Sequence, residues 1–172
     1  MLKPAQLYES ELIHRHEETW YDLRYMYARA GMCAYDIQLP NNTAENHSFV
    51  SIYKDAVIGL ISYNVDLEAM SASDLFIESY DIGNLIFVKD CFTAVCNIFE
   101  KYNLARLDWN AIEGNPAIKT YRKFIKMCGG REVGFLKNKV RLMDGQLHDQ
   151  IYFEILSEDF LKWRHNKHIK GE

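Results

Sequence analysis

The amino-acid sequence predicts a single α/β (α+β) domain in which a mixed sheet carries helices on both faces. Three observations support this: the chain has 172 residues, 48% of them are hydrophobic, and helix-like and strand-like segments alternate along it. A chain of this size and composition usually forms one compact core. A strand–helix–strand order requires a crossover connection, which implies a parallel or mixed sheet.

The first half of the chain predicts a helix, a β-hairpin and a further strand. Apolar residues recur at helical spacing over residues 12–30, which predicts a helix packed by one face. Residues 49–53 and 57–61 are rich in β-branched and aromatic side chains, and the short Lys54–Asp55 turn between them predicts a hairpin. Residues 75–80 look like a third strand.

The second half continues with two helices and a closing hairpin. Apolar residues over 88–102 form the clearest helical stripe, and the alternation over 106–111 predicts a half-buried strand. Asn115 is a good N-cap for a helix with Pro116 at its first position, and Gly129–Gly130 ends that helix. Two more strand-like runs, residues 132–143 and 150–156, flank an Asp144–Gly145 turn.

Domain limits follow from the same pattern. No Pro/Gly-rich linker or repeat divides the chain, so residues 1–162 are expected to form one domain. Residues 163–172 are polar, basic and without periodicity, which predicts a solvated tail.

Charge and composition argue against several classes of function. The formal net charge of −4 does not favour nucleic-acid binding, which needs a clear excess of basic side chains. No apolar run is long enough to span a bilayer and the N-terminus has no signal-like segment, so we expect a cytoplasmic protein. The four cysteines are widely spaced, and His14 and His16 would point to different helix faces, so no metal site is predicted.

Two segments resemble the GCN5-related N-acetyltransferases (GNAT). The order of elements, Asn115–Pro116 followed by Tyr121, and the Gly129–Gly130 ending are similar to that family over nearly the whole chain. The closing segment, residues 144–156, is similar to the subgroup that acetylates ribosomal-protein N-termini. The resemblance implies a mixed, mostly antiparallel central sheet and acetyl-CoA as co-substrate, without a metal.

The phosphate loop departs from the family pattern. Members carry Gln/Arg-x-x-Gly-x-Gly/Ala before a helix, whereas the matching stretch here is Gly83–Val88, with both motif glycines replaced by bulky residues. Amide donors and the helix dipole do not require glycine, although close backbone approach becomes harder. The resemblance therefore assigns phosphate binding to four backbone amides, those of Ile86, Phe87, Val88 and Lys89.

The resemblance also implies catalytic roles. It places the donor to the thioester oxygen at a backbone N–H near Ser79 and Tyr80, and the general acid at Tyr121. Tyr121 also lies on an apolar helical stripe, so a core role is the alternative. Asn115 would contact the pantetheine arm or serve as an N-cap. Glu78 is the best-placed base, and the alternatives are Asp108, Asp149 or a water chain.

The leading hypothesis is an acetyl-CoA-dependent N-acetyltransferase that acts on a small-molecule or peptide amine. The alternative is a catalytically inactive GNAT-like CoA-binding or regulatory module. A third possibility is a purely structural homo-oligomeric protein, for instance a homodimer, whose sheets pair by their last strands. Acceptor choice would come from the first helix and from the loops at 31–48 and 64–74. In the second loop Asp66, Glu68 and Asp74 would attract an amine or simply be solvated.

Overall fold

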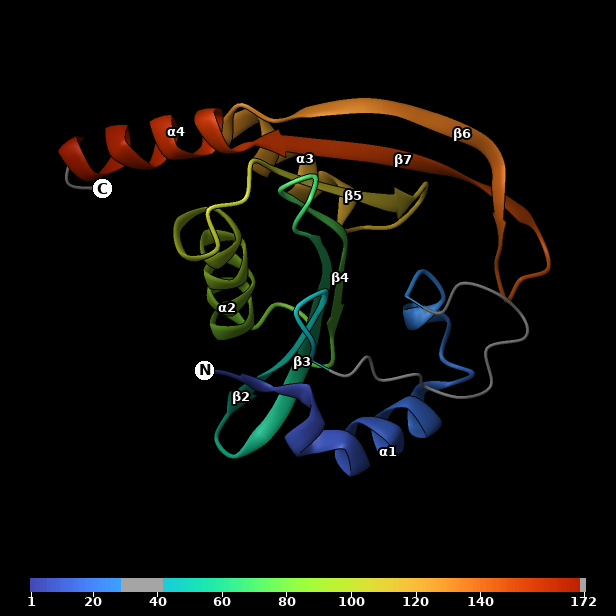
Figure 1. The fold of residues 1–172 in the computed structure, drawn as a ribbon. Coiled ribbons are helices and arrows are strands. Elements are labelled where there is room, and N and C mark those ends of the chain that lie inside the picture. Colours follow the sequence, from blue (N-terminus) through green and yellow to red (C-terminus); the bar gives the residue numbers. More distant parts are fainter. Residues whose placement is uncertain (29–41, 171–172) are drawn as a thin grey trace.

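The structure, a computed structural model, describes residues 1–28 and 42–170, and in this part of the chain seven strands form one sheet (Figure 1). The strands are β1 (Leu2–Pro4), β2 (Asn46–Tyr53), β3 (Ala56–Asp66), β4 (Ser71–Ser79), β5 (Arg106–Ile112), β6 (Arg131–Arg141) and β7 (Leu147–Leu156). Their order across the sheet is β1-β2-β3-β4-β5-β7-β6. Among these strands only β4 and β5 pair in parallel, so the sheet is mixed and mostly antiparallel, as expected.

Helices cover both faces of this sheet. They are α1 (Glu9–Thr19), α2 (Leu85–Cys96), α3 (Ile118–Cys128) and α4 (Ser157–Lys170), and α2 continues as a π-helical turn over Asn97–Lys101. α1 packs through the buried Leu12 on Val50 and Leu60 of the β2–β3 hairpin. α2, α3 and α4 share the larger core on the other face, where Trp109 and Phe160 are among the most buried side chains. The expected α/β class is confirmed.

The hairpin turns have the backbone that their sequences predict. Lys54 and Asp55 have φ values of 49° and 61°, so both central residues of the β2–β3 turn are left-handed. Two such residues give the turn twist that suits a two-residue hairpin. Gly145 in the β6–β7 connection has φ 77°, a conformation that glycine adopts without strain. Both predicted hairpins are therefore present.

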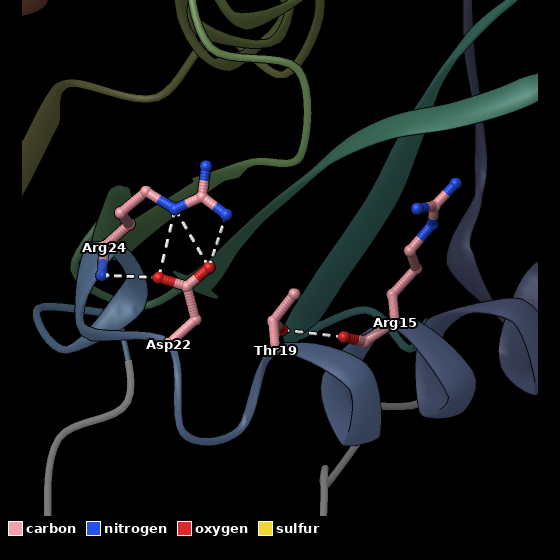
Figure 2. Close-up of polar contacts among 4 residues, drawn as sticks. All are labelled: Arg15, Thr19, Asp22 and Arg24. Carbon is pink, nitrogen blue, oxygen red and sulfur yellow. Dashed lines mark hydrogen bonds and ion pairs between the residues drawn. The ribbon is translucent and has the colours of Figure 1, made fainter.

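α1 is shorter than the sequence predicted. The expected helix covered residues 12–30, but α1 ends at Thr19 and a short 3₁₀ turn follows at Leu23–Tyr25. The Asp22 carboxylate accepts a hydrogen bond from the backbone N–H of Arg24 at 2.9 Å and from its Nε at 2.9 to 3.0 Å (Figure 2). An Asp side chain bonded two residues ahead competes with helix continuation. The predicted helix end near Ala30 lies outside the described residues.

α3 begins two residues later than expected. The prediction placed Pro116 at the first helical position, whereas the helix starts at Ile118. Asn115 Oδ1 accepts a hydrogen bond from the Ala117 N–H at 2.9 Å, and the Asn115 carbonyl accepts one from the Ile118 N–H at 3.1 Å. These bonds form a separate turn before the helix. Gly129 ends the helix with φ 84°, as predicted.

The predicted solvated tail is instead helical as far as Lys170. α4 starts at Ser157 and includes residues 163–170, so the prediction of a loose segment was wrong there. Phe160 is fully buried, and the ring of Trp163 meets Phe92 of α2 edge-on at 5.9 Å between centroids. Residues three apart share a helix face. The two aromatic side chains therefore anchor a helix whose remaining composition is polar.

Candidate active site

β4 and β5 separate soon after they begin. They pair at Ser71 with Arg106 and at Ala72 with Leu107, although both strands continue well beyond those residues. β5 pairs along its length with β7 instead. Between the diverging strands lies a cavity of about 290 Å³, near the lower end of the size range for small-molecule sites. The described residues that line it are Tyr27, Ala28, Asp74, Leu75, Phe76, Ile77, Asn110, Ala111, Ile112, Asn115, Tyr121 and Gln150.

A β-bulge in β4 shapes one wall of this cavity. The pairing with β3 shifts between Asn64–Ser73 and Ser62–Phe76, so two β4 residues, Asp74 and Leu75, occupy the space of one. Asp74 has φ 53°, in the left-handed region that few residues other than glycine and Asn or Asp adopt. Bulges of this kind redirect side chains and are over-represented beside active sites.

β4 turns backbone N–H groups toward the cavity. The Tyr80 N–H donates to the Ile58 carbonyl at 2.9 Å, so it is already used within the sheet. In an antiparallel ladder the residues that bond to one neighbour alternate with residues that face the other side. The N–H groups of Ser79 and Ile77 therefore face the side from which β5 has separated. Of Ser79 and Tyr80, which were predicted to carry the donor, only Ser79 has its backbone N–H on the side of the cavity. The N–H of Ile77 lies on the same side and was not predicted from the sequence.

Tyr121 of α3 lines the cavity, where the sequence placed the general acid. Its ring lies edge-on to Trp109 at 5.8 Å and to Phe153 at 5.8 Å between centroids. Burial, with a smaller contribution from Cys91, raises the pKa of Tyr121 to about 12. The phenol is thus protonated at neutral pH, in the form that an acid requires. The same contacts show that Tyr121 also belongs to the core.

Asn115 also lines the cavity. Its side-chain oxygen accepts a hydrogen bond from the Ala117 N–H in the turn before α3. The N-cap position of α3 is Ala117, so the predicted N-cap role of Asn115 was wrong. Contact with a pantetheine arm would therefore fall to the amide nitrogen and stays a prediction.

Glu78, the predicted base, does not share the cavity with Tyr121 and Asn115. It is 4% exposed, its Oε2 accepts a hydrogen bond from the Tyr80 hydroxyl at 3.1 Å, and it is not among the described residues that line the cavity. Phe76 and Tyr80, which share its parity in β4, pack on the α1 side of the sheet. The base role of Glu78 stays a prediction, and any contact with the cavity would need an intervening water.

A polar chain that sequence reasoning missed forms the β5–β7 wall. The Tyr152 hydroxyl donates to Gln150 Oε1 at 2.9 Å, and Gln150 Nε2 donates to Asn110 Oδ1 at 2.6 Å. These bonds set the orientation of the Asn110 side-chain amide. Its oxygen is used by Gln150, and its Nδ2 is left to donate a hydrogen bond at the cavity wall. The alternation of polar residues along β5 and β7 was the available signal, but it does not reveal which strands are neighbours.

The start of α2, where the resemblance placed the cofactor phosphates, is capped by its own chain. Asn84 Oδ1 accepts a hydrogen bond from the Ile86 N–H at 2.8 Å, and the Asn84 carbonyl accepts one from the Val88 N–H at 3.2 Å. Leu85 is 79% exposed and Val88 is 55% exposed. The first turn thus presents apolar side chains to solvent.

Phe87, the third residue of α2, faces the sheet. It is buried, and a Cβ added to Gly59 of β3 would lie 2.3 Å from its ring. The absence of a side chain at Gly59 is therefore what lets the first turn of α2 sit this close to β3. Lys89, one turn into the helix, is exposed.

Within residues 1–28 and 42–170 no three His, Cys, Asp or Glu side chains are grouped as a metal site would require. The helices of the same residues include none with the length and apolarity needed to cross a membrane.

Comparisons with known proteins bear on the fold. No family model and no curated protein matches the sequence. The solved structure of the spermidine/spermine N-acetyltransferase SpeG from Vibrio cholerae matches with a TM-score of 0.59 and 19% identity, over 89% of this chain and 77% of SpeG. A probable acetyltransferase of the GNAT family from Chromobacterium violaceum matches with a TM-score of 0.58 and 15% identity, over 69% of this chain and 62% of that one.

The fold is that of GNAT acetyltransferases. The match to SpeG extends over most of the chain, and the mixed sheet with one parallel β4–β5 pair agrees with the fold that the resemblance implied. At identities of 15 to 19% the likeness concerns the fold.

Proposed function

We propose that this protein is an acetyl-CoA-dependent N-acetyltransferase of the GNAT superfamily that acts on an amine of a small molecule or peptide. The observation that carries the proposal is the β4–β5 cavity, in which an outward-facing N–H of β4 and the protonated phenol of Tyr121 share one space. Acetyl transfer from a thioester needs a donor to the carbonyl oxygen and an acid for the departing thiolate. The backbone of Ile77 and the hydroxyl of Tyr121 supply these two groups.

The residues fit the co-substrate in two places. Acetyl-CoA would supply the acetyl group as a thioester. The open edge of β4 offers the N–H groups of Ile77 and Ser79 to an extended, amide-bearing arm, in the way an added strand pairs with a sheet edge. The N-terminal end of α2 follows β4 after a short loop and carries the positive end of the helix dipole. Lys89 is the exposed cation closest to that end in sequence.

One feature opposes phosphate binding at α2. Asn84 already satisfies the Ile86 N–H, so a phosphate oxygen must displace a side chain of the same loop or use the neighbouring amides. The exposed side chains of Leu85 and Val88 carry no positive charge that could attract a phosphate. These observations favour the second candidate function, a GNAT-like module that regulates or binds without turnover.

Thermal unfolding with acetyl-CoA tests whether the co-substrate binds, and the transfer assay then separates the transferase from a module that binds without turnover. Saturation at about 100 times the dissociation constant adds about 2.7 kcal/mol to the free energy of unfolding, which raises the midpoint by roughly 5 to 10 °C for a domain of this size. Acetyl-pantetheine, which lacks the nucleotide phosphates, is the matched ligand. At equal concentrations of the two ligands, a larger rise with acetyl-CoA indicates that the nucleotide part contributes to binding, as expected if the start of α2 binds its phosphates.

The transfer itself is measured as free CoA thiol released in the presence of amines. We expect acceptor-dependent release from the wild-type protein. A midpoint unchanged by both ligands, together with no acceptor-dependent thiol, would contradict the transferase and favour the module. Membership of the subgroup that acetylates ribosomal-protein N-termini requires that peptides with a free N-terminus be acceptors.

A further inference from the structure

We infer that Asp74 selects the acceptor by binding a second ammonium group, so that the preferred acceptor class is a short aliphatic diamine or a longer polyamine. The inference rests on the proposed transferase and concerns the same cavity. It follows from the charge of the cavity lining, the backbone at Asp74 and the position of Asp74 along β4.

The first step is the charge of the cavity lining. Among the twelve described residues that line the cavity, Asp74 is the one with a formally charged side chain. None of these twelve residues is Lys, Arg or His. A described lining with one carboxylate and no cation favours an acceptor that carries extra positive charge over one that carries a carboxylate.

The second step is the local structure that holds this carboxylate. Asp74 is the bulge residue of β4, with φ 53°, and Asn64 Nδ2 donates to its Oδ2 at 3.2 Å. Within the described part of the chain, Oδ1 has no hydrogen-bond partner. Residues held in such sparsely populated conformations cluster at ligand sites. One oxygen is therefore fixed by Asn64 and the other is free to accept from a ligand.

The other two acidic residues of this region have different surroundings. Asp66 Oδ1 accepts hydrogen bonds from the backbone N–H groups of Glu68 and Ala69, each at 2.9 Å, so it closes the β3–β4 turn. Glu68 is exposed in that turn and does not line the cavity. The structure thus distinguishes Asp74, which lines the cavity, from Asp66 and Glu68, which are not among the described lining residues. Nothing in the sequence alone favours one of the three.

The third step is distance along β4. Ile77, the proposed donor to the thioester oxygen, lies three residues after Asp74. Because Asp74 and Leu75 share one position of the ladder, this corresponds to two positions, or about 7 Å of strand. The attacking nitrogen lies about 3 Å from the thioester carbon, and an ammonium lies about 3 Å from its carboxylate partner. An acceptor that reaches both points therefore needs only a short aliphatic chain between its two nitrogens. Asp74 is therefore too far away to be the base and is placed to bind the opposite end of the acceptor.

The test compares three acceptors of equal chain length: putrescine, butylamine and γ-aminobutyrate. They end in an ammonium, a methyl group and a carboxylate, respectively. With acetyl-CoA saturating, we expect kcat/KM to be highest for putrescine and lowest for γ-aminobutyrate. Asp74→Asn should raise the KM for putrescine about three- to tenfold, a modest factor because Asp74 is exposed, and leave that for butylamine unchanged.

Glu68→Gln is the matched control, because it removes one negative charge from the adjacent turn without touching the cavity. It should leave the putrescine preference intact. Calorimetric titration of putrescine into the wild type and Asp74→Asn, at low and high salt, supplies a readout that does not depend on turnover. Weaker binding by Asp74→Asn, and by the wild type at high salt, is expected.

The outcomes separate the two proposals. Equal kcat/KM for putrescine and butylamine, unchanged in Asp74→Asn, overturns the role of Asp74 and leaves the transferase standing. If no amine is acetylated, the transferase fails, and the calorimetric comparison still decides whether Asp74 binds a diamine. Equal putrescine affinity in the wild type and Asp74→Asn overturns the inference in either case.

Discussion

The contacts that pack Tyr121 into the core also raise the pKa of its phenol. The rings of Trp109 and Phe153 enclose it, and that burial is the main cause of its raised pKa. A hydroxyl that stays protonated across the physiological range is suited to donate a proton. A buried position therefore does not count against a catalytic role here.

Replacement of Tyr121 by Phe tests that role. We expect kcat to fall by about 100-fold or more, because general acids contribute at this level, while the thermal midpoint stays nearly constant because the ring contacts remain. Because the pKa of Tyr121 is raised to about 12, the wild-type rate should show no loss from its ionisation until the pH approaches that value. Tyr53→Phe, the same change at an exposed tyrosine, should behave as wild type. Unchanged turnover in Tyr121→Phe would remove the proposed acid.

Some residues of the candidate site were predicted from the sequence and others were not. Asn115 and Tyr121 were located because helix signals fix their spacing, and both line the cavity. Asp74 was noticed as one of three acidic residues, since neither a bulge nor its left-handed backbone can be read from alternation. Ile77 was missed because the role proposed for it belongs to its backbone N–H and not to its side chain. Glu78, the expected base, is not among the described residues that line the cavity, and its hydrogen bond from the Tyr80 hydroxyl cannot be read from strand alternation.

At the scale of elements, strands were easier to predict than helix ends. The hairpins at Lys54–Asp55 and Asp144–Gly145 follow from turn chemistry and are present. α1 ended early because the Asp22 carboxylate bonds local backbone, a competition that periodicity does not reveal. α4 was overlooked because the contacts that stabilise it come from α2, far away in sequence.

Phe160 gives a direct test of α4 as part of the core. It has no exposed surface and lies 4.7 Å from the ring of Phe99, measured between centroids. Phe160→Ala should lower the free energy of unfolding by about 3 to 5 kcal/mol, as for other large-to-small core substitutions, measured by chemical denaturation. Leu161→Ala, on the exposed side of the same helix, should cost less than about 1 kcal/mol. Equal effects of the two substitutions would mean that α4 is not docked.

At the scale of the whole molecule, the two edge strands of the sheet, β1 and β6, differ in length and exposure. β6 lies at the edge of the sheet beside β7 (Figure 1). β1 has three residues, whereas β6 has eleven and is exposed along nearly all of them, including Val133, Phe135 and Leu136. A long edge strand with apolar side chains favours pairing with another chain, and lysines such as Lys137 and Lys139 oppose it. Pairing of two copies would thus be confined to the first half of β6.

We expect a mass in solution that rises toward that of a dimer with protein concentration, measured by light scattering. Phe135→Lys should shift this equilibrium to the monomer, because it places a charge in the proposed interface. Lys139→Ala, in the half that already carries charge, should not weaken association. A monomer at every concentration would exclude the homodimer.

The close approach of Phe87 to Gly59 also has a consequence for motion. The ring occupies the place of a side chain on β3, and the Glu78 carbonyl of β4 lies within 2.7 Å of the same point. A tilt of the first turn of α2 would move this ring against the backbone of β3 and β4, so we expect these three elements to move together. Any widening of the cavity would then come from displacement of β5, β7 and α3 relative to them.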